Sequence, residues 1–379
     1  MVPDEGEAVL IERVAIRRWW YVVCLVLVLC GAGAIRIFRL NAIPVDSDEA
    51  VTLSWLAEPT CWKMLRSVAA DLVNQPLYPL LLRLWRDIRG DSVPQLRELS
   101  VFFGWAAVAF SPFLLRRRAW PGLMLAGYVA VLPIHVQFSQ RLRAYGLLLC
   151  LATLQLAIFQ NWSTGGRKRG VLLAVVTCLG MYCHVVFVFL VAGEVLVLLL
   201  QRKTSSTTTR LWALTVGVLA FAPWAVASLY FREQGMANHA GWIPRPYPDR
   251  LGGIASRLVV GAMPSLAVKW ILAWVSAIGA IGVATYHFMH RLVSRKREER
   301  RLLIMAGVPV GLVLAASCVL PFSLAIDRYF LALLPAISLS VIRGLYRTRF
   351  HGAALWGLLI LDCLILTLGN PPGVGAYEP

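Results

Sequence analysis

Three acidic residues lie within four positions of the stretch 41–95, which follows the first apolar segment of the chain. They are Asp46, Asp48 and Glu49, a dense group for a sequence with only 20 acidic residues among 379. A carboxylate held at a membrane face can act as a general base and accept the proton of an acceptor hydroxyl. The stretch 41–95 is therefore the predicted catalytic loop, with at least one of these acids in a catalytic role.

The residues alone leave two other roles open for the same acids. Ser47 or Asp48 would cap a helix that begins at Glu49, because short polar side chains cap helices and the helix dipole favours acids in the first turn. The acidic cluster would also suit a divalent cation, although Asp-Ser-Asp by itself is a weak metal motif. Capping and catalysis are compatible with one another.

Arginines and tyrosines form a second unusual group, in two short polar segments between apolar runs. The group consists of Arg141, Arg143 and Tyr145 in the segment 139–145, and of Arg328 and Tyr329 in the segment 326–330. Guanidinium groups bind phosphate through paired hydrogen bonds, so the arginines are candidates to bind an anionic ligand. The alternative is that these long side chains extend to lipid headgroups at the membrane interface.

Histidine and cysteine give little support for a metal site. The eight cysteines include no CxxC pair, and most of them lie inside apolar runs, so neither a zinc site nor a disulfide framework is predicted. His184 stands alone in the segment 181–187, and a single histidine of this kind is more often structural than a ligand. It remains a candidate for substrate binding because a predicted span reaches the outer face there.

The elements that must position these residues are transmembrane helices. Hydrophobic residues make up 59% of the chain and charged residues 15%, and the mean hydropathy is +0.68. Apolar runs of about 20 residues recur along the chain, which is the length that a helix needs to cross a bilayer. They are too long and too uniformly apolar for the alternating strands of a membrane barrel. The sequence predicts an all-α polytopic membrane protein.

We expect about eleven transmembrane helices, beginning with a retained signal anchor over 19–40. The other expected spans are 97–115, 120–138, 143–161, 170–184, 185–201, 211–230, 266–290, 302–322, 328–345 and 352–369. The long apolar run 170–201 is divided at His184, and an uneven division would reverse the orientation of everything that follows it. The stretch 76–90 is expected to lie on the membrane surface as an amphipathic helix, because its second half carries four charged residues.

Basic clusters predict the orientation of the chain. Six clusters of Lys and Arg lie at span ends that the positive-inside rule places in the cytoplasm, and the loop 41–95 then faces the outside of the inner (plasma) membrane. The expected division is a cytoplasmic segment 1–18, a transmembrane domain 19–370 and a tail 371–379. The formal charge of +17 does not indicate nucleic-acid binding, since no continuous basic face or aromatic platform accompanies it.

Five short motifs follow one another along the chain. They are Asp48-Glu49-Ala50, Pro76-Leu77-Tyr78, Arg143-Ala144-Tyr145, Trp242-Ile243-Pro244-Arg245-Pro246, and Arg328-Tyr329-Phe330 with Leu334-Pro335. Each motif is weak alone, but the ordered set, over roughly residues 36–335, is more specific. It resembles the dolichyl-phosphate-mannose–protein mannosyltransferase superfamily, whose bacterial members are membrane glycosyltransferases of the C fold, similar to the lipid A aminoarabinose transferase.

The resemblance implies an inverting transferase with a polyprenyl-phosphate-sugar donor and a lipid, glycan or protein acceptor. Carried over, Asp48 is the general base, with Glu49 and Asp46 beside it. The residues expected near the donor phosphate are Arg143, Arg328, Arg141, Tyr145 and Tyr329. Those expected to bind substrate are Asn74, Gln75, Tyr78, His184 and Trp242. Relatives often have the motif D-x-H-P-P-L-Y, where this chain has Asn74-Gln75-Pro76-Leu77-Tyr78. The sugar and the acceptor therefore stay undetermined.

The competing hypothesis is a transporter or flippase for an anionic lipid or solute. Such proteins carry charges buried at mid-membrane and often inverted repeats. The predicted spans contain few charges, notably Glu194, Lys269 and Asp362, of which Glu194 is the candidate relay residue. A purely structural membrane scaffold would leave the acidic cluster of the loop 41–95 without an explanation.

Overall fold

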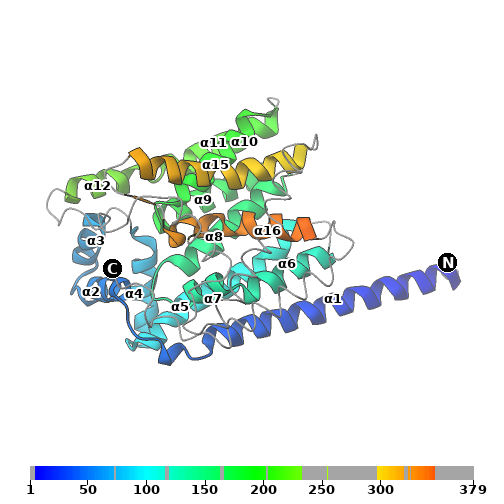
Figure 1. Ribbon diagram of the computed structural model, residues 1–379, viewed down its shortest axis with the longest axis horizontal. Coiled ribbons are helices and arrows are strands. Elements are labelled where there is room, and N and C mark those ends of the chain that lie inside the picture. Colours follow the sequence, from blue (N-terminus) through cyan, green and yellow to red (C-terminus); the bar gives the residue numbers. More distant parts are fainter. Residues whose placement is uncertain are drawn as a thin grey trace.

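The computed structural model describes most of the chain. The described residues are 5–71, 74–115, 119–162, 166–201, 204–232, 254, 297–319, 323–324 and 326–345. They form a bundle of helices in which α1 extends well beyond the others (Figure 1). The predicted spans 266–290 and 352–369, the tail 371–379 and Trp242 lie outside the described residues.

From α1 to α12 the described helices follow one another closely along the chain (Figure 1). They are α1 (Glu5–Ile37), α2 (Ser47–Ala57), α3 (Cys61–Ala70), α4 (Leu77–Arg89), α5 (Val93–Phe110), α6 (Ala119–Val131), α7 (Pro133–Ser139), α8 (Tyr145–Gln160), α9 (Arg167–Cys183), α10 (Phe187–Leu199), α11 (Ser205–Leu219), α12 (Ala222–Arg232), α15 (Arg297–Val319) and α16 (Leu334–Leu345), with 3-10 turns η1 (Leu40–Ala42), η2 (Ser111–Leu115) and η3 (Asp327–Leu333).

Three helical segments of the described chain are long and apolar enough to cross a membrane. They are Trp19–Ala42, Val93–Leu115 and Ser205–Phe231. Each contains one of the predicted spans, 19–40, 97–115 or 211–230. The agreement follows because a membrane-spanning helix must be apolar over about 20 residues, and this is the pattern on which the prediction was based. The apolar helices α8 and α10 are shorter, and Ile304–Val319 is the corresponding apolar part of α15.

Two predicted spans differ from the structure. The segment 120–138 is not one straight span, because α6 and α7 meet at a bend of 61°. Leu132 is extended, as the residue before a proline usually is, and Pro133 begins α7 without a backbone donor for the preceding turn. The segment 328–345 starts as the 3-10 turn η3, and only α16 is α-helical. The predicted break at His184 is confirmed, since α9 ends at Cys183 and α10 begins at Phe187.

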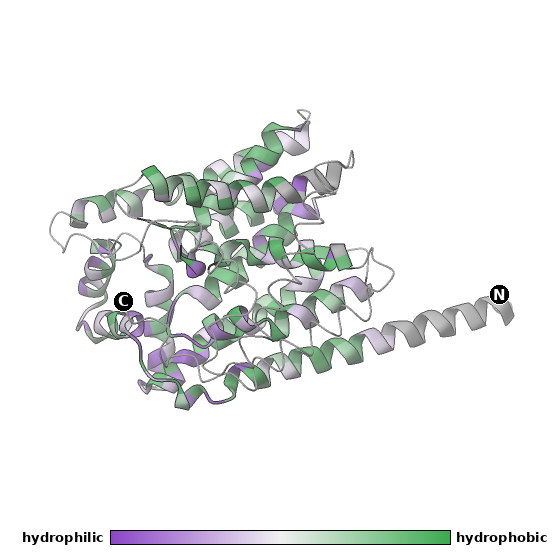
Figure 2. Ribbon diagram, viewed as in Figure 1, coloured by the Kyte–Doolittle hydropathy of each residue, from purple (hydrophilic) through white to green (hydrophobic). Residues whose placement is uncertain are grey.

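The predicted loop 41–95 folds into the short helices α2, α3 and α4 at one end of the bundle (Figure 1), and hydrophilic residues recur along this end (Figure 2). The charges in the second half of α4 have specific partners. Arg83 donates to the carbonyl of Glu58 at 3.0 Å and Arg86 to that of Leu56 at 2.9 Å. Cations favour the carbonyl end of a helix, so these bonds hold α4 against the last turn of α2.

The helices α5 and α8, which carry residues next to the predicted catalytic loop, are in close contact, and their backbones nearly touch. A Cβ atom added to Gly146 of α8 would lie 2.4 Å from the carbonyl oxygen of Ser100 on α5. Only glycine allows this approach. Ser100 lies on α5 and Tyr145 lies on α8, so the distance between the two helices sets the distance between these residues.

We expect Gly146→Ala to destabilise the protein by about 1–3 kcal/mol, the usual cost of overpacking a close contact. The measurement is thermal unfolding of the purified protein in detergent. Gly127→Ala is the matched control, because a Cβ atom at Gly127 meets nothing within 4 Å. Equal melting temperatures for the two variants would contradict the close approach.

Candidate active site

Asp46 caps the N-terminus of α2 and thereby fixes the position of the acidic cluster. Its carboxylate accepts a hydrogen bond from the backbone nitrogen of Glu49 at 2.8 Å, while the Glu49 carboxylate accepts from the backbone nitrogen of Asp46 at 3.4 Å. This reciprocal pair is a capping box. The helix therefore starts at Ser47, and the cap is Asp46 in place of the predicted Ser47 or Asp48. Asp48 lies in the first turn of α2.

Glu49 is fully buried and bound to Arg97 of α5. Arg97 Nε donates to Glu49 Oε1 at 2.9 Å and Arg97 Nη2 to Oε2 at 2.6 Å, and the backbone nitrogen of Leu142 also donates to Oε1 at 2.6 Å. The other Arg97 donors bind carbonyl oxygens of the segment before α2, those of Leu40, Ile43 and Pro44. This buried ion pair joins α2 to α5, to the segment before α2 and to Leu142.

Asp46 and Asp48 each pair with one of the arginines singled out from the sequence. Arg141 donates to the Asp46 carboxylate, and Arg328 donates to the Asp48 carboxylate. The two carboxylates are 26% and 30% exposed, whereas the arginine side chains are 4% and 9% exposed. The carboxylates are therefore accessible from solution and are backed by nearly buried cations. Arg328 and Asp48 come from opposite ends of the chain.

Arg143 binds protein groups with both of its terminal nitrogens. Nη1 donates to the backbone carbonyl of Asp48 at 3.0 Å and to the Thr52 hydroxyl at 3.1 Å. Nη2 donates to the side-chain oxygen of Asn74 at 2.9 Å. The guanidinium also lies 5.8 Å from the centre of the Trp55 ring. Arg143 thus joins the first turns of α2 to the segment before α4, and holds Asp48 from behind.

The aromatic candidates Tyr145, His184 and Tyr329 lie next to one another. The rings of Tyr145 and His184 are 6.0 Å apart, and those of His184 and Tyr329 are 5.7 Å apart. His184 also pairs with Asn74 through the backbone, and its Nδ1 accepts a hydrogen bond from Val186 at 3.3 Å. That bond fixes Nδ1 as an unprotonated acceptor. The structure brings three predicted residues from three different segments into one buried cluster.

Tyr78 is linked to Arg143 through the hydroxyl of Ser100. Its hydroxyl lies 2.7 Å from the hydroxyl of Ser100, which donates to the backbone carbonyl of Arg143 at 3.1 Å. Burial raises the pKa of the Tyr78 phenol, so this hydroxyl stays protonated. The neighbouring Gln75 is also buried. The Tyr78 hydroxyl therefore helps to position the backbone of Arg143, with Ser100 between them, inside the protein.

The acidic cluster does not form a metal site with the residues that the structure describes. Within the described ranges no group of three or more His, Cys, Asp or Glu side chains is placed to hold a metal ion. Each acid of the cluster lies against an arginine: Asp46 against Arg141, Asp48 against Arg328, and Glu49 against Arg97. A positive partner already occupies one side of every carboxylate, and this donor set does not fit a divalent cation.

Sequence reasoning missed two buried arginines, Arg97 at the candidate site and Arg36 in α1. Arg97 stands at the start of a predicted apolar span, outside the basic clusters, and this was the same signal that singled out Arg141. Arg36 lies inside the first apolar run, where it donates to the carbonyl of Ala130 at 2.9 Å and contacts His135 Nδ1 at 2.8 Å. A charge within or beside an apolar run is costly unless it is paired, and this is the signal that could have found both residues.

Comparisons with known proteins identify the fold. No family model matches the chain, and no curated protein matches it in sequence. Among solved structures, ArnT from Cupriavidus metallidurans in the apo state is similar over 93% of this chain with a TM-score of 0.60 and 16% identity. The same protein bound to undecaprenyl phosphate gives 92% coverage, a TM-score of 0.58 and 14% identity.

An archaeal protein shares the architecture. The apo oligosaccharyltransferase of Archaeoglobus fulgidus is similar over 96% of this chain, with a TM-score of 0.53 and 12% identity. This chain spans 63% of the length of ArnT and 57% of the length of the oligosaccharyltransferase. At such low identities the similarity establishes the fold alone. The chain has the polytopic, all-helical C-type fold of these membrane glycosyltransferases, as the ordered motifs predicted.

Proposed function

We propose that the chain is an integral-membrane glycosyltransferase that moves a sugar from a polyprenyl-phosphate donor to an acceptor hydroxyl. The pairing of Asp48 with Arg328 is the observation that carries this proposal. The reaction needs a base for the acceptor proton and a cation for the departing phosphate, and the two groups lie here side by side with the carboxylate open to solution. ArnT, whose fold the chain shares, binds undecaprenyl phosphate, which supports the same class of donor here.

The proposed reaction is a single displacement. The acceptor oxygen attacks the anomeric carbon while the bond to the phosphate oxygen breaks, and the configuration inverts. The phosphate leaves with the bonding electron pair, and Asp48 takes the acceptor proton. We assign Arg328 to the phosphate, so donor binding draws its guanidinium from Asp48 and releases the carboxylate to act as base.

The remaining candidates surround these two groups. Arg141, Tyr145 and Tyr329 complete the proposed phosphate environment. Arg143 contributes positive charge there and positions Asp48 through its backbone carbonyl. Asn74, Gln75, Tyr78, His184 and Trp242 are the proposed substrate-binding residues. Glu49 is assigned a positioning role, since its carboxylate is buried against Arg97. The acceptor is a lipid, a glycan or a protein.

The location of the site in the cell is part of the same proposal. The basic clusters favour an N-terminus in the cytoplasm and an active site on the outer face of the inner (plasma) membrane. Polyprenyl-phosphate sugars are lipids, so a site at the membrane surface allows the lipid chain to remain in the bilayer while the phosphate reaches Arg328.

Titration of the purified protein in detergent with a short-chain polyprenyl phosphate tests the phosphate assignment. Arg328→Ala is expected to weaken binding by about 10- to 100-fold, because a lost charge-assisted hydrogen bond costs roughly 1.5–3 kcal/mol. Arg328→Lys should restore it only in part, since lysine lacks the fork of donors. Arg89→Ala is the matched control, because Arg89 forms an exposed pair with Glu98. Wild-type binding by Arg328→Ala would remove Arg328 from the phosphate site.

One observation favours a transporter or flippase as the second candidate. Glu194 of α10 is fully buried, and its Oε2 accepts a hydrogen bond from Gln155 at 2.7 Å. Buried ionisable groups within membrane helices often serve as relay residues. Sugar transfer by the detergent-solubilised protein distinguishes the hypotheses, because detergent offers no two compartments between which a lipid could be moved. Transport in vesicles without any transfer in detergent would favour the second candidate.

A further inference from the structure

Asp71 is an acidic residue beside the candidate active site that has no part in the chemistry proposed above. It is partly buried and forms the C-cap of α3, where its backbone nitrogen donates to the carbonyl of Val68. The carbonyl end of a helix carries partial negative charge, so a carboxylate at this position is unfavourable for the helix. Stabilisation of α3 therefore does not account for Asp71, and its contacts outside the helix are the relevant ones.

The carboxylate of Asp71 binds Asn74 and fixes the orientation of its side-chain amide. Asn74 Nδ2 donates to Asp71 Oδ2 at 2.8 Å, and the backbone nitrogen of Asn74 donates to Oδ1 at 3.4 Å. The backbone of the buried Asn74 also pairs with that of His184, at the break between α9 and α10. An ionised carboxylate only accepts hydrogen bonds, so the nitrogen of the amide must face Asp71 and its oxygen must face away.

The oxygen of the same amide binds Arg143. Asn74 Oδ1 accepts a hydrogen bond from Arg143 Nη2 at 2.9 Å, while Nη1 of this arginine donates to the carbonyl of Asp48 and to the hydroxyl of Thr52. A guanidinium only donates, so a reversed amide would place a second donor against it. The Asp71 carboxylate disfavours the reversed amide, and it therefore helps to hold the guanidinium of Arg143 against α2.

Charge connects Asp71 to two segments of the site. Asp71 is close enough to interact electrostatically with both Arg143 and Tyr329. Asp46 and Asp48 each bind an arginine directly, whereas Asp71 is joined to Arg143 through the neutral amide of the residue between them. Each of the three arginines selected from the sequence is thereby matched with one acid.

We propose that Asp71 is a positioning residue, which orients the guanidinium of Arg143 through the amide of Asn74 and thereby supports Asp48. This role rests on the sugar transfer proposed at Asp48. The guanidinium holds the backbone carbonyl of Asp48 in the first turn of α2 and keeps its charge near the proposed donor phosphate. Asn74 is the bridge, with the nitrogen and the oxygen of its amide both bound within the protein.

The test exchanges the carboxylate and the amide in the full chain, purified in detergent. Asp71→Asn is expected to lower turnover of a polyprenyl-phosphate sugar about tenfold, because the amide of Asn74 is no longer held in one orientation and Arg143 loses its fixed acceptor. Asn74→Asp should also lower turnover, since two carboxylates then face each other. The double variant Asp71→Asn/Asn74→Asp should recover most of the loss, because the new amide donates to the new carboxylate, which accepts from Arg143.

Binding of a short-chain polyprenyl phosphate separates position from charge. Asp71→Asn removes a negative charge beside Arg143, so attraction alone would tighten binding of this anion. Loss of the orientation of Arg143 weakens binding, and we expect a weakening of several-fold. Asp87→Asn is the matched control, because Asp87 is an exposed acid of α4 that pairs with Arg86. Turnover and phosphate binding should be unchanged in this control.

Melting temperatures of the wild type, the two single variants and the double variant complete the test. Folded single variants with wild-type turnover, or a double variant no better than the poorer single variant, would overturn the bridge. Tighter phosphate binding by Asp71→Asn would overturn it as well, since only charge would then matter. A wild-type protein that transfers no sugar would refute the proposed function instead. The bridge is then decided by stability: the double variant should be more stable than the sum of the two single effects predicts, and additive effects would overturn it.

Discussion

Replacing Asp48 with asparagine is expected to lower the rate of sugar transfer by about 100-fold or more and to leave the protein folded. General-base catalysis contributes about 10²- to 10⁴-fold, and an amide cannot take the acceptor proton. The fold should tolerate the change, because the side chain is 30% exposed and the contact of Asp48 with Arg143 uses the backbone carbonyl. The measurement is turnover of a polyprenyl-phosphate sugar by purified protein, with the melting temperature recorded in parallel.

Asp46→Asn is the matched control for Asp48→Asn. It removes the neighbouring carboxylate, which is exposed to a similar degree and also pairs with an arginine. Asparagine caps helices about as well as aspartate does, so α2 should still begin at Ser47. The rate should therefore fall much less than in Asp48→Asn. A wild-type rate in Asp48→Asn would show that the base is another group. Lost donor binding with unchanged turnover at saturation would show that Asp48 only orients Arg328.

The helical architecture was predictable because it follows from hydropathy, which can be read from a short window of sequence. Trp19–Ala42 and Val93–Leu115 are apolar over the length of a bilayer, and any fold that satisfies their backbone in lipid must be helical there. The bend at Pro133 escaped prediction for a related reason. Hydropathy averages over a window and finds one span, whereas the bend depends on a single missing donor and on the extended residue before it.

The partners in the candidate site were less predictable than its members. Sequence reasoning selected Asp48 and Arg328 separately, as unusual charges on one side of the predicted topology. Their contact depends on how η3 packs near α2, and no local pattern contains that information. Arg143 was selected as a phosphate ligand, yet the structure occupies its donors with Asp48, Thr52 and Asn74. Its anomalous position was a sound signal, and the partner could not be inferred.

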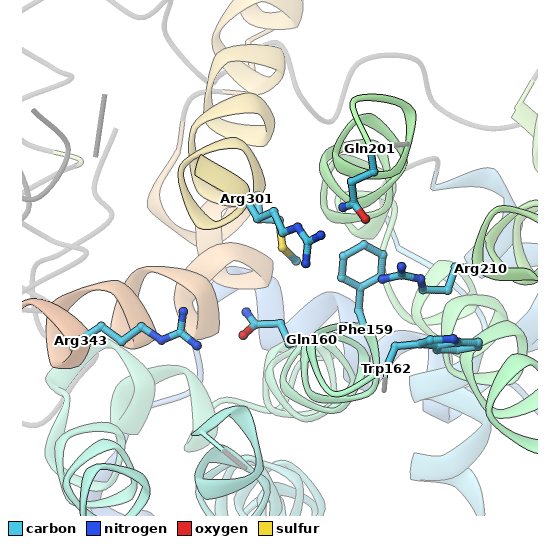
Figure 3. Close-up of a pocket in the computed structure, with 8 residues that line it drawn as sticks. Phe159, Gln160, Trp162, Gln201, Arg210, Arg301 and Arg343 are labelled. Carbon is cyan, nitrogen blue, oxygen red and sulfur yellow. The ribbon is translucent and has the colours of Figure 1, made fainter. Parts of the chain in front are cut away.

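The basic clusters illustrate a further limit of the sequence. Arg210, Arg301 and Arg343 entered the prediction only as markers of the cytoplasmic side, where each is interchangeable with any other cation. The positive-inside rule concerns the number of charges in a loop, and it has no information on the direction of a side chain. They line one cavity because α11, α15 and α16 pack with these positions close together (Figure 3).

Glu49→Gln is expected to destabilise the protein by about 3–5 kcal/mol, the usual cost of breaking a buried ion pair. The loss comes mainly from Arg97, which would remain charged and buried without its counter-ion, since both side chains are at most 1% exposed. Chemical or thermal unfolding in detergent measures the effect. Glu98→Gln is the matched control, because it makes the same substitution opposite Arg89 in an exposed pair, and should cost about 0–1 kcal/mol.

This comparison also decides whether Glu49 takes part in the chemistry. Arg97 holds the carbonyl oxygens of Leu40, Ile43 and Pro44 together with Glu49, so the ion pair anchors the segment that leads into Asp46 and Asp48. If Glu49 only positions that segment, the activity of Glu49→Gln should recover at temperatures low enough to keep the variant folded. A folded Glu49→Gln protein with turnover as low as that of Asp48→Asn would instead make Glu49 a catalytic residue. Equal destabilisation by Glu49→Gln and Glu98→Gln would show that burial of the pair contributes nothing.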